Sequence, residues 1–502
     1  MSNSEKIKNI VFACFFIEAG LINLLLSIIL ECFKIEIPNG VVEIVKYCFY
    51  GIIFIYIFWA YIKTIIKINL LSLRVIVFAL PCIFIFPEVY NCIVSSWEFD
   101  AIVYLFKYIV FIIPVYFIGI CIILNGEKAD IAFMKYYKYI ALLLSPFFVF
   151  YLIRMTFPEN PIVNYSNFGL LDYMSMGYFI LPIFLGSFLE WALLSETRKD
   201  KILSILSGVL CFICIICTGT RGAILVTICF ALLLFIYAII CKQNIKKIFL
   251  FMAFIIFVNI FAQYVWQPTG SRFGKKFIDD ITYSKVVETY KESGFLAEGS
   301  AESREKQSAE FIEARSIILQ YAVENDLTYA QSVKKALKEI KMGNVENVYK
   351  GKIADSVLHE LYELEEEDLM TLSRKPLIEI SIMEFNKNKL FGNGCYHYIN
   401  KYTYYPHNAI CELMCDTGII GTMFFVSSII SILILTRKLL IKCKNIAIML
   451  IFTLSYTPSY LISGSVYMDL MIPLFITIGT ITIVANKNNN LMSSENENNI
   501  TE

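Results

Sequence analysis

The stretch ILSILSGVLCFICIICTGTRGAILVTICFALLLFIYAII, residues 202–240, holds two long apolar runs with a single arginine, Arg221, between them. A helix needs roughly 20 apolar residues to cross a bilayer, and each run has about that length. The intervening residues are too few for a loop. The stretch therefore predicts two antiparallel membrane helices joined by a tight turn, and this makes the chain an integral membrane protein.

The composition of the whole chain agrees with this prediction. Of its 502 residues, 58% are hydrophobic and only 17% are charged, which favours a polytopic membrane protein. The formal net charge is zero, so there is no general basic field for nucleic acid. Cys211, Cys214 and Cys217 stand at helical spacing inside an apolar run, which is typical of small buried side chains. We expect no metal site and no cofactor.

Ten more windows of sufficient length and apolarity lie on either side of this hairpin. With the hairpin's spans at 201–218 and 222–241 they predict an all-α protein with about 12 transmembrane helices, although Pro81 and Pro87 interrupt one window. The ten windows are 9–30, 45–66, 73–94, 101–124, 136–156, 174–194, 246–265, 413–436, 445–463 and 467–485.

Basic residues gather in every second turn, which predicts the orientation through the positive-inside rule. The alternate connections are acidic, with Glu98 and Asp100 in one and Glu159 and Asp172 in the next. Both termini are therefore expected in the cytoplasm. The basic turns hold Lys63 and Lys67; Lys128 and Lys135; Arg198, Lys199 and Lys201; Lys242, Lys246 and Lys247; and Arg437, Lys438, Lys442 and Lys444.

This orientation divides the chain into four parts. Residues 1–265 form transmembrane helices 1–9, and residues 266–412 form one large extracytoplasmic loop. Residues 413–485 form the last three helices, and Asn-rich composition predicts a disordered cytoplasmic tail over 486–502.

Within the large loop, residues 301–369 predict charged amphipathic helices. The expected role is a solvated cap whose apolar side chains pack on each other or on the membrane helices. These apolar positions are Phe311, Ile312, Ile317, Ile318 and Tyr321.

Arg221 sits at the outer membrane margin in this topology. One interpretation is an arginine that extends to lipid headgroups. The other is an anion site, since Thr218, Gly219, Thr220 and Gly222 surround it with hydroxyls and backbone amides, and a helix begins there.

His407 precedes the tenth predicted span in PHNAICELMCDTGIIG, residues 406–421. A helix through this segment would stack Asn408, Glu412 and Asp416 on one face, while Gly418 and Gly421 would permit close approach to another helix. A neutral imidazole steadied by an amide or a carboxylate is suited to be a general base. A structural histidine, with Asp416 as an interface residue, is the alternative. The other histidines, His359 and His397, lack such a pattern, and we expect them to be dispensable.

Three motifs together resemble the O-antigen ligase and O-antigen polymerase superfamily. CTGTRGAIL (217–225) resembles its Ser/Thr-Arg-Gly-Ala signature, and the segment after Pro406 resembles its His-Asn, acid-x-Gly, Gly signature. Between them, SRKPLIEISIMEFNKNKLFGNG (373–394) is similar to the family's arginine, apolar helix and glycine turn, but without the usual proline before Gly392. The motifs stand in the family's order, and the resemblance covers residues 160–485.

The resemblance implies a GT-C-like membrane glycosyltransferase without metal or cofactor, acting outside the cytoplasmic membrane. Its donor would be an oligosaccharide on undecaprenyl diphosphate or a similar polyprenyl carrier, and its acceptor a glycan or lipid-linked glycan. A repeat-unit polymerase for O-antigen, capsule or exopolysaccharide is the first expectation. A ligase acting on lipid, wall polymer or protein is the alternative, and a transporter or flippase for lipid-linked sugars is the rival of another class. Flippases and chain-length regulators are the partner proteins that such a role implies.

The resemblance also assigns roles to residues. Arg221 and Arg374 would hold the donor diphosphate, although Arg272, Arg304 and Arg315 compete for the second position, and His407 would activate the acceptor hydroxyl. The supporting residues would be Thr220, Gly222, Asn408 and Asp416. The candidate glycan contacts, in a polar outer loop, are Asn164, Tyr165 and Asp172.

The orientation can be tested with a membrane-impermeant thiol reagent on variants that keep one cysteine each. Cys395 lies in the predicted outer loop and should react in intact spheroplasts, whereas Cys443 follows a predicted cytoplasmic turn and should react only after lysis. Labelling of Cys443 in intact spheroplasts would invert the orientation and separate Arg221 from the compartment assigned to it.

Overall fold

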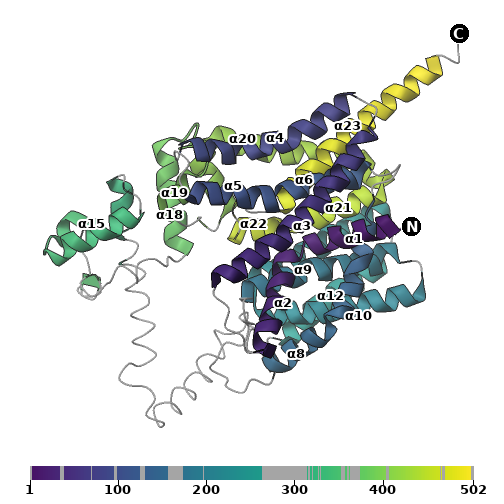
Figure 1. The fold of residues 1–502 in the computed structure, drawn as a ribbon, viewed down its shortest axis with the longest axis horizontal. Helices are drawn as coiled ribbons and strands as arrows, with labels where there is room; N and C mark the ends of the chain where they lie inside the picture. The colour runs from purple at the N-terminus through teal and green to yellow at the C-terminus, as the bar shows by residue number, and fades with distance from the viewer. Residues whose placement is uncertain are drawn as a thin grey trace. The chain divides into compact units, whose positions relative to one another are not determined.

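In the computed structural model, helices are the regular secondary structure of the part of the chain that it describes (Figure 1). No strand occurs in those residues, so the predicted all-α class is confirmed. The described residues are 3–33, 39–68, 71–94, 99–124, 130–156, 173–195, 197–242, 244–262, 314, 317–318, 320–325, 327, 329–351, 357–358, 361, 374–402, 406, 408–463, 465 and 470–498.

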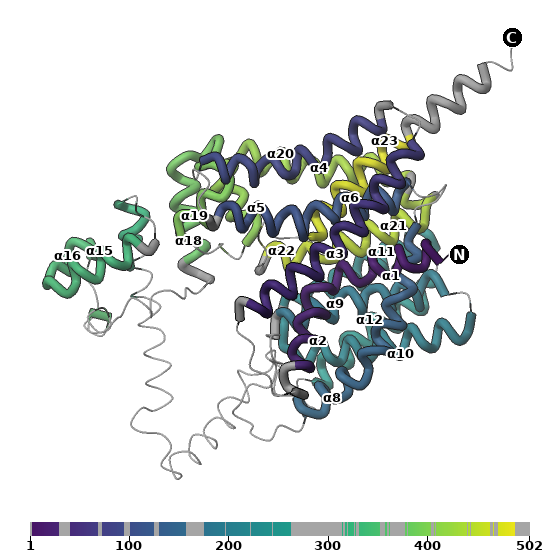
Figure 2. Tube along the Cα trace, in the orientation of Figure 1, coloured from purple at the N-terminus to yellow at the C-terminus, as the bar shows by residue number. Residues whose placement is uncertain are grey.

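The chain divides into two compact units, and Figure 2 traces the path through them. The first unit comprises residues 1–276, 428–459 and 469–502, and the second comprises 277–427 and 460–468. The second unit thus coincides broadly with the predicted large loop, together with the start of the tenth predicted span.

The helices of the first unit enclose one continuous apolar core. Within it α10 packs on α9, α6 on α23, and α11 on α12. The helices are α1 (Asn3–Phe15), α2 (Glu18–Phe33), α3 (Asn39–Ile66), α4 (Leu71–Val94), α5 (Phe99–Phe111), α6 (Ile113–Leu124), η1 (Ala132–Tyr136), α7 (Tyr137–Leu143), α8 (Ser145–Thr156), α9 (Tyr173–Leu189), η2 (Glu190–Leu194), α10 (Arg198–Thr218), α11 (Arg221–Cys241), α12 (Ile245–Phe261), α21 (Lys444–Leu454), α22 (Thr457–Ser463), whose end belongs to the second unit, and α23 (Met471–Asn498).

Seven helices among the described residues are long and apolar enough to cross a membrane, or up to nine if each of two bent pairs is one span. This supports a polytopic membrane protein. Each of the other three predicted windows also contains helix: α12 in 246–265, α21 and α22 in 445–463, and α23 in 467–485. The total of twelve stays a prediction.

Two predicted spans are bent in the structure. The first is divided into α1 and α2, which meet at 82°, and the fifth into η1–α7 and α8, which meet at 57°. In the second case Pro146 lies in the first turn of α8, where its missing N–H prevents the hydrogen bond that would continue α7. By contrast, α4 runs unbroken from Leu71 to Val94 with Pro81 and Pro87 inside it.

At the other end of the chain, α23 continues to Asn498 and so includes most of the segment predicted to be disordered. The apolar first half of α23 packs on α6 and α21 in the core. A formed helix is easily lengthened because each added residue gains a hydrogen bond without new nucleation.

The second unit has a smaller core of its own. It contains α15 (Tyr329–Lys341), α16 (Val345–Val348), α18 (Arg374–Lys387), α19 (His397–Tyr402) and the first part of α20 (Ala409–Lys442). Ile317, Ile318 and Tyr321 are buried there, as the amphipathic pattern predicts, and they belong to one cluster with Leu377 and Tyr398. Phe311 and Ile312 lie outside the described residues.

Candidate functional site

Arg221 is the first residue of α11, as the sequence predicts for a tight helical hairpin. The preceding helix, α10, ends at Thr218, and Gly219 then takes the left-handed conformation with φ 65°. Only a residue without Cβ enters this region readily, so Gly219 allows the chain to reverse in two residues. The Arg221 side chain lies outside the described part of the chain.

Two threonine hydroxyls are buried at this turn. Thr218 Oγ1 lies 2.7 Å from the Ile215 carbonyl oxygen and 3.0 Å from Thr220 Oγ1. It also accepts a hydrogen bond of 3.2 Å from the Thr220 amide. Thr220 is the N-cap residue of α11 but makes no side-chain cap hydrogen bond. The turn is thus held by threonine–threonine contacts, and the Thr220 hydroxyl does not fill the usual acceptor position at the helix start.

Glycines bring α9 and α22 close to the same turn. A Cβ on Gly177 of α9 would lie 2.6 Å from Thr220 Oγ1. A Cβ on Gly222 would overlap the Tyr178 hydroxyl and lie 3.8 Å from Ser459 Cβ of α22. Gly222 therefore serves close packing, and hydroxyl-bearing side chains surround the start of α11.

His407, the predicted base, lies outside the described residues, as do Asn164, Tyr165 and Asp172. Its neighbour Asn408 is described and caps α20: its Oδ1 accepts hydrogen bonds from the amides of Ile410 at 3.0 Å and Cys411 at 3.1 Å. Such a cap is typically worth about 1 kcal/mol. The cap fixes where α20 begins, at Ala409.

The two carboxylates predicted to stack behind Asn408 are both buried in the second unit. Glu412 accepts a 2.9 Å hydrogen bond from Ser465 Oγ. Asp416 Oδ1 accepts a 3.3 Å hydrogen bond from the Tyr398 amide, and only 1% of Asp416 is exposed. These contacts favour the interpretation of Asp416 as an interface residue.

α20 is broken at Gly418. The glycine turn, which follows α18 and contains Gly392 and Gly394, packs against this break. Gly418 has φ 67°, and the helix resumes beyond it. Four backbone hydrogen bonds cross this contact: from Asn393 to Cys415 (3.0 Å), from Gly394 to Asp416 (2.9 Å), from Ile419 to Lys389 (2.8 Å) and from Ile420 to Leu390 (3.2 Å). The peptide groups that the break removes from the helix are therefore paired with the turn.

The predicted glycine turn is confirmed by its backbone conformation. Gly392 has φ 72° and Gly394 has φ 105°, and a Cβ on Gly392 would overlap the Asp416 backbone. Gly418 makes a close approach, but to the backbone of Leu390 and Gly392 in this turn and not to another helix as predicted. Gly421 does not, because a Cβ there would meet the side chain of Thr417 in the same helix.

A buried carboxylate in α18, Glu384, was not predicted from the sequence. Its Oε1 accepts from Tyr402 Oη at 2.6 Å and from Lys387 Nζ at 2.9 Å, and its Oε2 lies 3.0 Å from His397 Nε2. Lys401 Nζ is 3.5 Å from Oε1. The i,i+3 spacing of Glu384 and Lys387 was the only part of this cluster visible in the sequence.

The surroundings of Glu384 keep it ionised. Burial raises its pKa, but hydrogen bonds from His397, Tyr402 and Lys387 outweigh burial, and the pKa lies well below its usual range. This carboxylate therefore ties α18 to α19 at any ordinary pH. From the sequence alone, His397 is expected to be dispensable. Because its ring contacts Glu384, we instead expect His397→Ala to destabilise the second unit.

Arg374 is the first residue of α18, and its side chain lies outside the described residues. The competing arginines Arg272, Arg304 and Arg315 also lie outside them. The structure describes the surroundings of the predicted site residues within each unit by itself: the hydroxyl-rich turn before Arg221 in the first unit, and the capped, broken start of α20 in the second.

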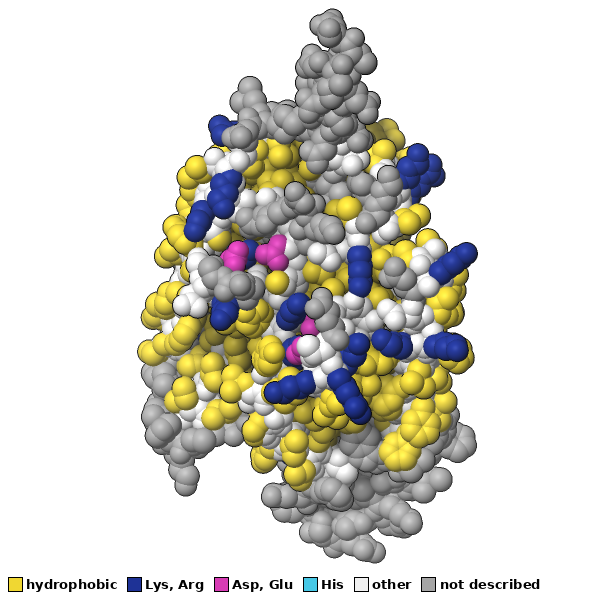
Figure 3. Space-filling model, turned by 90° about the vertical axis from the view of Figure 1, so that its right-hand side faces the viewer, with side chains coloured by type: hydrophobic (Ala, Val, Ile, Leu, Met, Phe, Trp, Pro, Cys, Tyr) yellow, Lys and Arg dark blue, Asp and Glu magenta, His cyan; other side chains and the backbone are white. Residues whose placement is uncertain are grey.

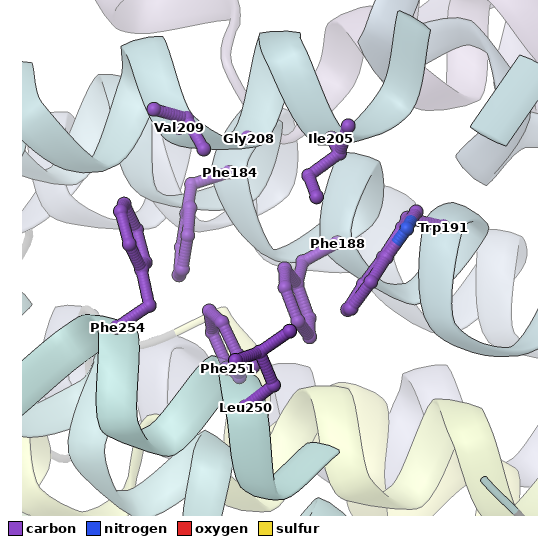
Figure 4. Close-up of a pocket in the computed structure, with 9 residues that line it drawn as sticks. All are labelled: Phe184, Phe188, Trp191, Ile205, Gly208, Val209, Leu250, Phe251 and Phe254. Carbon is purple, nitrogen blue, oxygen red and sulfur yellow. The ribbon is translucent and has the colours of Figure 1, made fainter. Parts of the chain in front are cut away.

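The first unit also contains an apolar cavity of about 260 Å³ between α9, η2, α10 and α12. Figure 4 shows its lining, in which Phe184, Phe188 and Trp191 face Phe251 and Phe254. No lining side chain carries a charge, so the cavity suits an apolar group and offers no acid or base. Cys211, Cys214 and Cys217 are fully buried elsewhere in this unit, as predicted.

Comparison with known proteins gives one match. Residues 206–426 match the family model described as O-antigen ligase. This region includes Arg221, Arg374, His407 and Asp416, and the match confirms the resemblance identified from the motifs. No curated protein and no solved structure matches the chain.

The break in α20 can be tested by substituting its glycine. Gly418→Ala should lower the free energy of unfolding by about 2–4 kcal/mol, because alanine is strained at positive φ and its Cβ would overlap the Leu390 carbonyl. The thermal midpoint of the purified protein in detergent measures this loss. Gly51→Ala is the matched control, since a Cβ on Gly51 in α3 meets nothing within 4 Å. Equal midpoints for the two variants would contradict the described packing.

Proposed function

Because residues 206–426 match the O-antigen ligase family model, we propose that this membrane protein is a glycosyltransferase that uses a lipid-linked donor. It moves an oligosaccharide from undecaprenyl diphosphate, or a similar polyprenyl carrier, to an acceptor hydroxyl at the outer face of the cytoplasmic membrane. The acceptor of first choice is another lipid-linked repeat unit, which makes the protein a polysaccharide polymerase. Transfer to lipid, wall polymer or protein would make it a ligase.

The proposed reaction is a substitution at C1 of the donor sugar. The acceptor oxygen forms a bond to C1 while the bond between C1 and the diphosphate oxygen breaks, and the polyprenyl diphosphate leaves with both bonding electrons. His407 takes the acceptor proton. Arginines neutralise the charge that develops on the diphosphate. No nucleoside triphosphate is consumed, because diphosphate is already a good leaving group.

The observation that carries the proposal is the position of Arg221 at the start of α11, within the matched region. The amides of a first helical turn point toward an anion, and the helix dipole adds to their attraction. The Thr220 side chain does not cap this turn, and Thr218 and Thr220 bring hydroxyl groups to it. A phosphate oxygen could occupy the acceptor position while the arginine guanidinium donates two parallel hydrogen bonds.

The proposed base has support from its neighbours. Asn408, which follows the proposed base in the sequence, caps α20 through its Oδ1. The Gly418 break and the glycine turn hold this helix by backbone bonds, which are insensitive to pH. We propose Arg374, at the start of α18, as the second diphosphate ligand. Asn164, Tyr165 and Asp172 remain the proposed glycan contacts.

Loss of the proposed base, His407, should lower turnover, whereas loss of the proposed phosphate ligand, Arg221, should lower kcat/KM for the donor. His407→Ala should lower turnover by about 100-fold or more, a loss of about 3 kcal/mol in transition-state stabilisation, with little change in donor KM. Elongation of a defined lipid-linked repeat unit by the purified protein measures both constants. His359→Ala is the control, since His359 lies in none of the three sequence motifs 217–225, 373–394 and 406–421.

Arg221→Lys should instead reduce kcat/KM for the donor by about tenfold or more, because an ammonium keeps the charge but cannot make the paired phosphate contact. Normal turnover in a folded His407→Ala protein would leave that histidine a packing residue. Normal kcat/KM in both Arg221→Lys and Arg221→Ala would leave Arg221 as an arginine that only reaches to lipid headgroups.

A further inference from the structure

A second cavity of the first unit is polar and lies far along the sequence from the motifs of the transfer reaction. It has a volume of about 230 Å³ and lies between the start of α1, the C-terminal half of α3 and Asp130, two residues before η1. At about 30 Å³ for each water molecule, this is room for roughly eight waters, or for a phosphate group with a short polar substituent. Three lysines line it: Lys8, Lys63 and Lys67.

The residues that line this cavity carry more positive than negative charges. Its acidic lining residues are Glu5 and Asp130, which leaves one excess positive charge from three lysines and two acids. Lys8 Nζ is 2.7 Å from Asp130 Oδ2, and Asp130 Oδ1 accepts a 3.1 Å hydrogen bond from the Ala132 amide. Lys8 and Asp130 thus form an ion pair with each other, and the excess positive charge comes from Lys63 and Lys67, which Glu5 offsets only in part.

Beside Lys63, α3 carries an exposed apolar surface. Ile52, Ile55 and Trp59 of α3 recur at helical spacing and are exposed by 65%, 65% and 51%. Lys63 follows one turn further, with its Nζ 5.1 Å from the centroid of the Trp59 ring. Residues 41–66 form one of the candidate membrane spans. This face of α3 therefore passes from an apolar track through an aromatic ring to a pair of lysines.

We propose that this cavity binds the phosphate-bearing headgroup of an anionic membrane lipid, with an acyl chain lying along Ile52 and Ile55. Basic pockets beside membrane helices attract such headgroups, and tryptophan favours the boundary between chains and headgroups. The face turned to the viewer in Figure 3, on the side where Figure 1 marks the N-terminus, carries mainly lysine and arginine among its charged side chains. This proposal does not depend on the transfer reaction, since no residue of the cavity takes part in it.

Native mass spectrometry of the full-length protein tests the proposal. Retention of phosphatidylglycerol is compared with that of phosphatidylcholine of the same acyl chains. Lys63→Gln/Lys67→Gln should lower retention of phosphatidylglycerol by at least fivefold and by up to about thirtyfold, since each lysine near an anionic lipid contributes about a fivefold change. Retention of phosphatidylcholine should not change.

The matched control, Lys242→Gln/Lys246→Gln, removes the same charge from two exposed lysines outside the cavity and should bind phosphatidylglycerol normally. An equal loss in both double variants would mean a response to net charge alone, and no loss in either would mean a solvated basic turn. Displacement of the lipid by millimolar inorganic phosphate would identify a site for free phosphate. Each of these three results would overturn the lipid site.

Discussion

The break in α20 depends on one constraint: peptide groups that leave a helix must find other partners, because water cannot reach them at a packed interface. At Gly418 the helix conformation is interrupted, and four backbone hydrogen bonds to the Lys389–Gly394 turn replace what the helix loses. The positive φ of Gly418 and Gly392 makes this exchange possible. Because the turn follows α18 directly, the same bonds set the position of α18 against the start of α20, where Asn408 and Asp416 lie.

A second polar layer reinforces this arrangement. Glu384 of α18 gathers hydrogen bonds from Lys387, His397 and Tyr402, and Asn393 Nδ2 donates to the carbonyl oxygens of both Glu384 and Cys415 at 3.0 Å. A buried carboxylate is stable only when its charge is compensated in this way. The second unit is therefore held by polar contacts around α18 in addition to its own apolar core.

The sequence predicted the helical class, the turn at Arg221 and the glycine turn because each rests on local patterns: apolar length, or glycine at a tight reversal. It did not predict the bend between α1 and α2, nor the cluster around Glu384. His397 stands 13 residues from Glu384, and only the turn between α18 and α19 brings them together. The prediction for Asn408 was incomplete for a similar reason, since its side chain caps α20 and an N-cap is recognised only when the helix start is known.

The proposed function requires that this membrane protein makes glycosidic bonds and does not move lipid-linked sugars. Its most direct test uses the purified full-length protein in liposomes that contain a defined polyprenyl-diphosphate-linked repeat unit. Mass spectrometry follows new glycosidic bonds, and an impermeant sugar-modifying reagent follows translocation. A glycosyltransferase should give longer glycans and released polyprenyl diphosphate without translocation. Translocation with no new glycosidic bond would contradict the proposed function and make the protein a transporter.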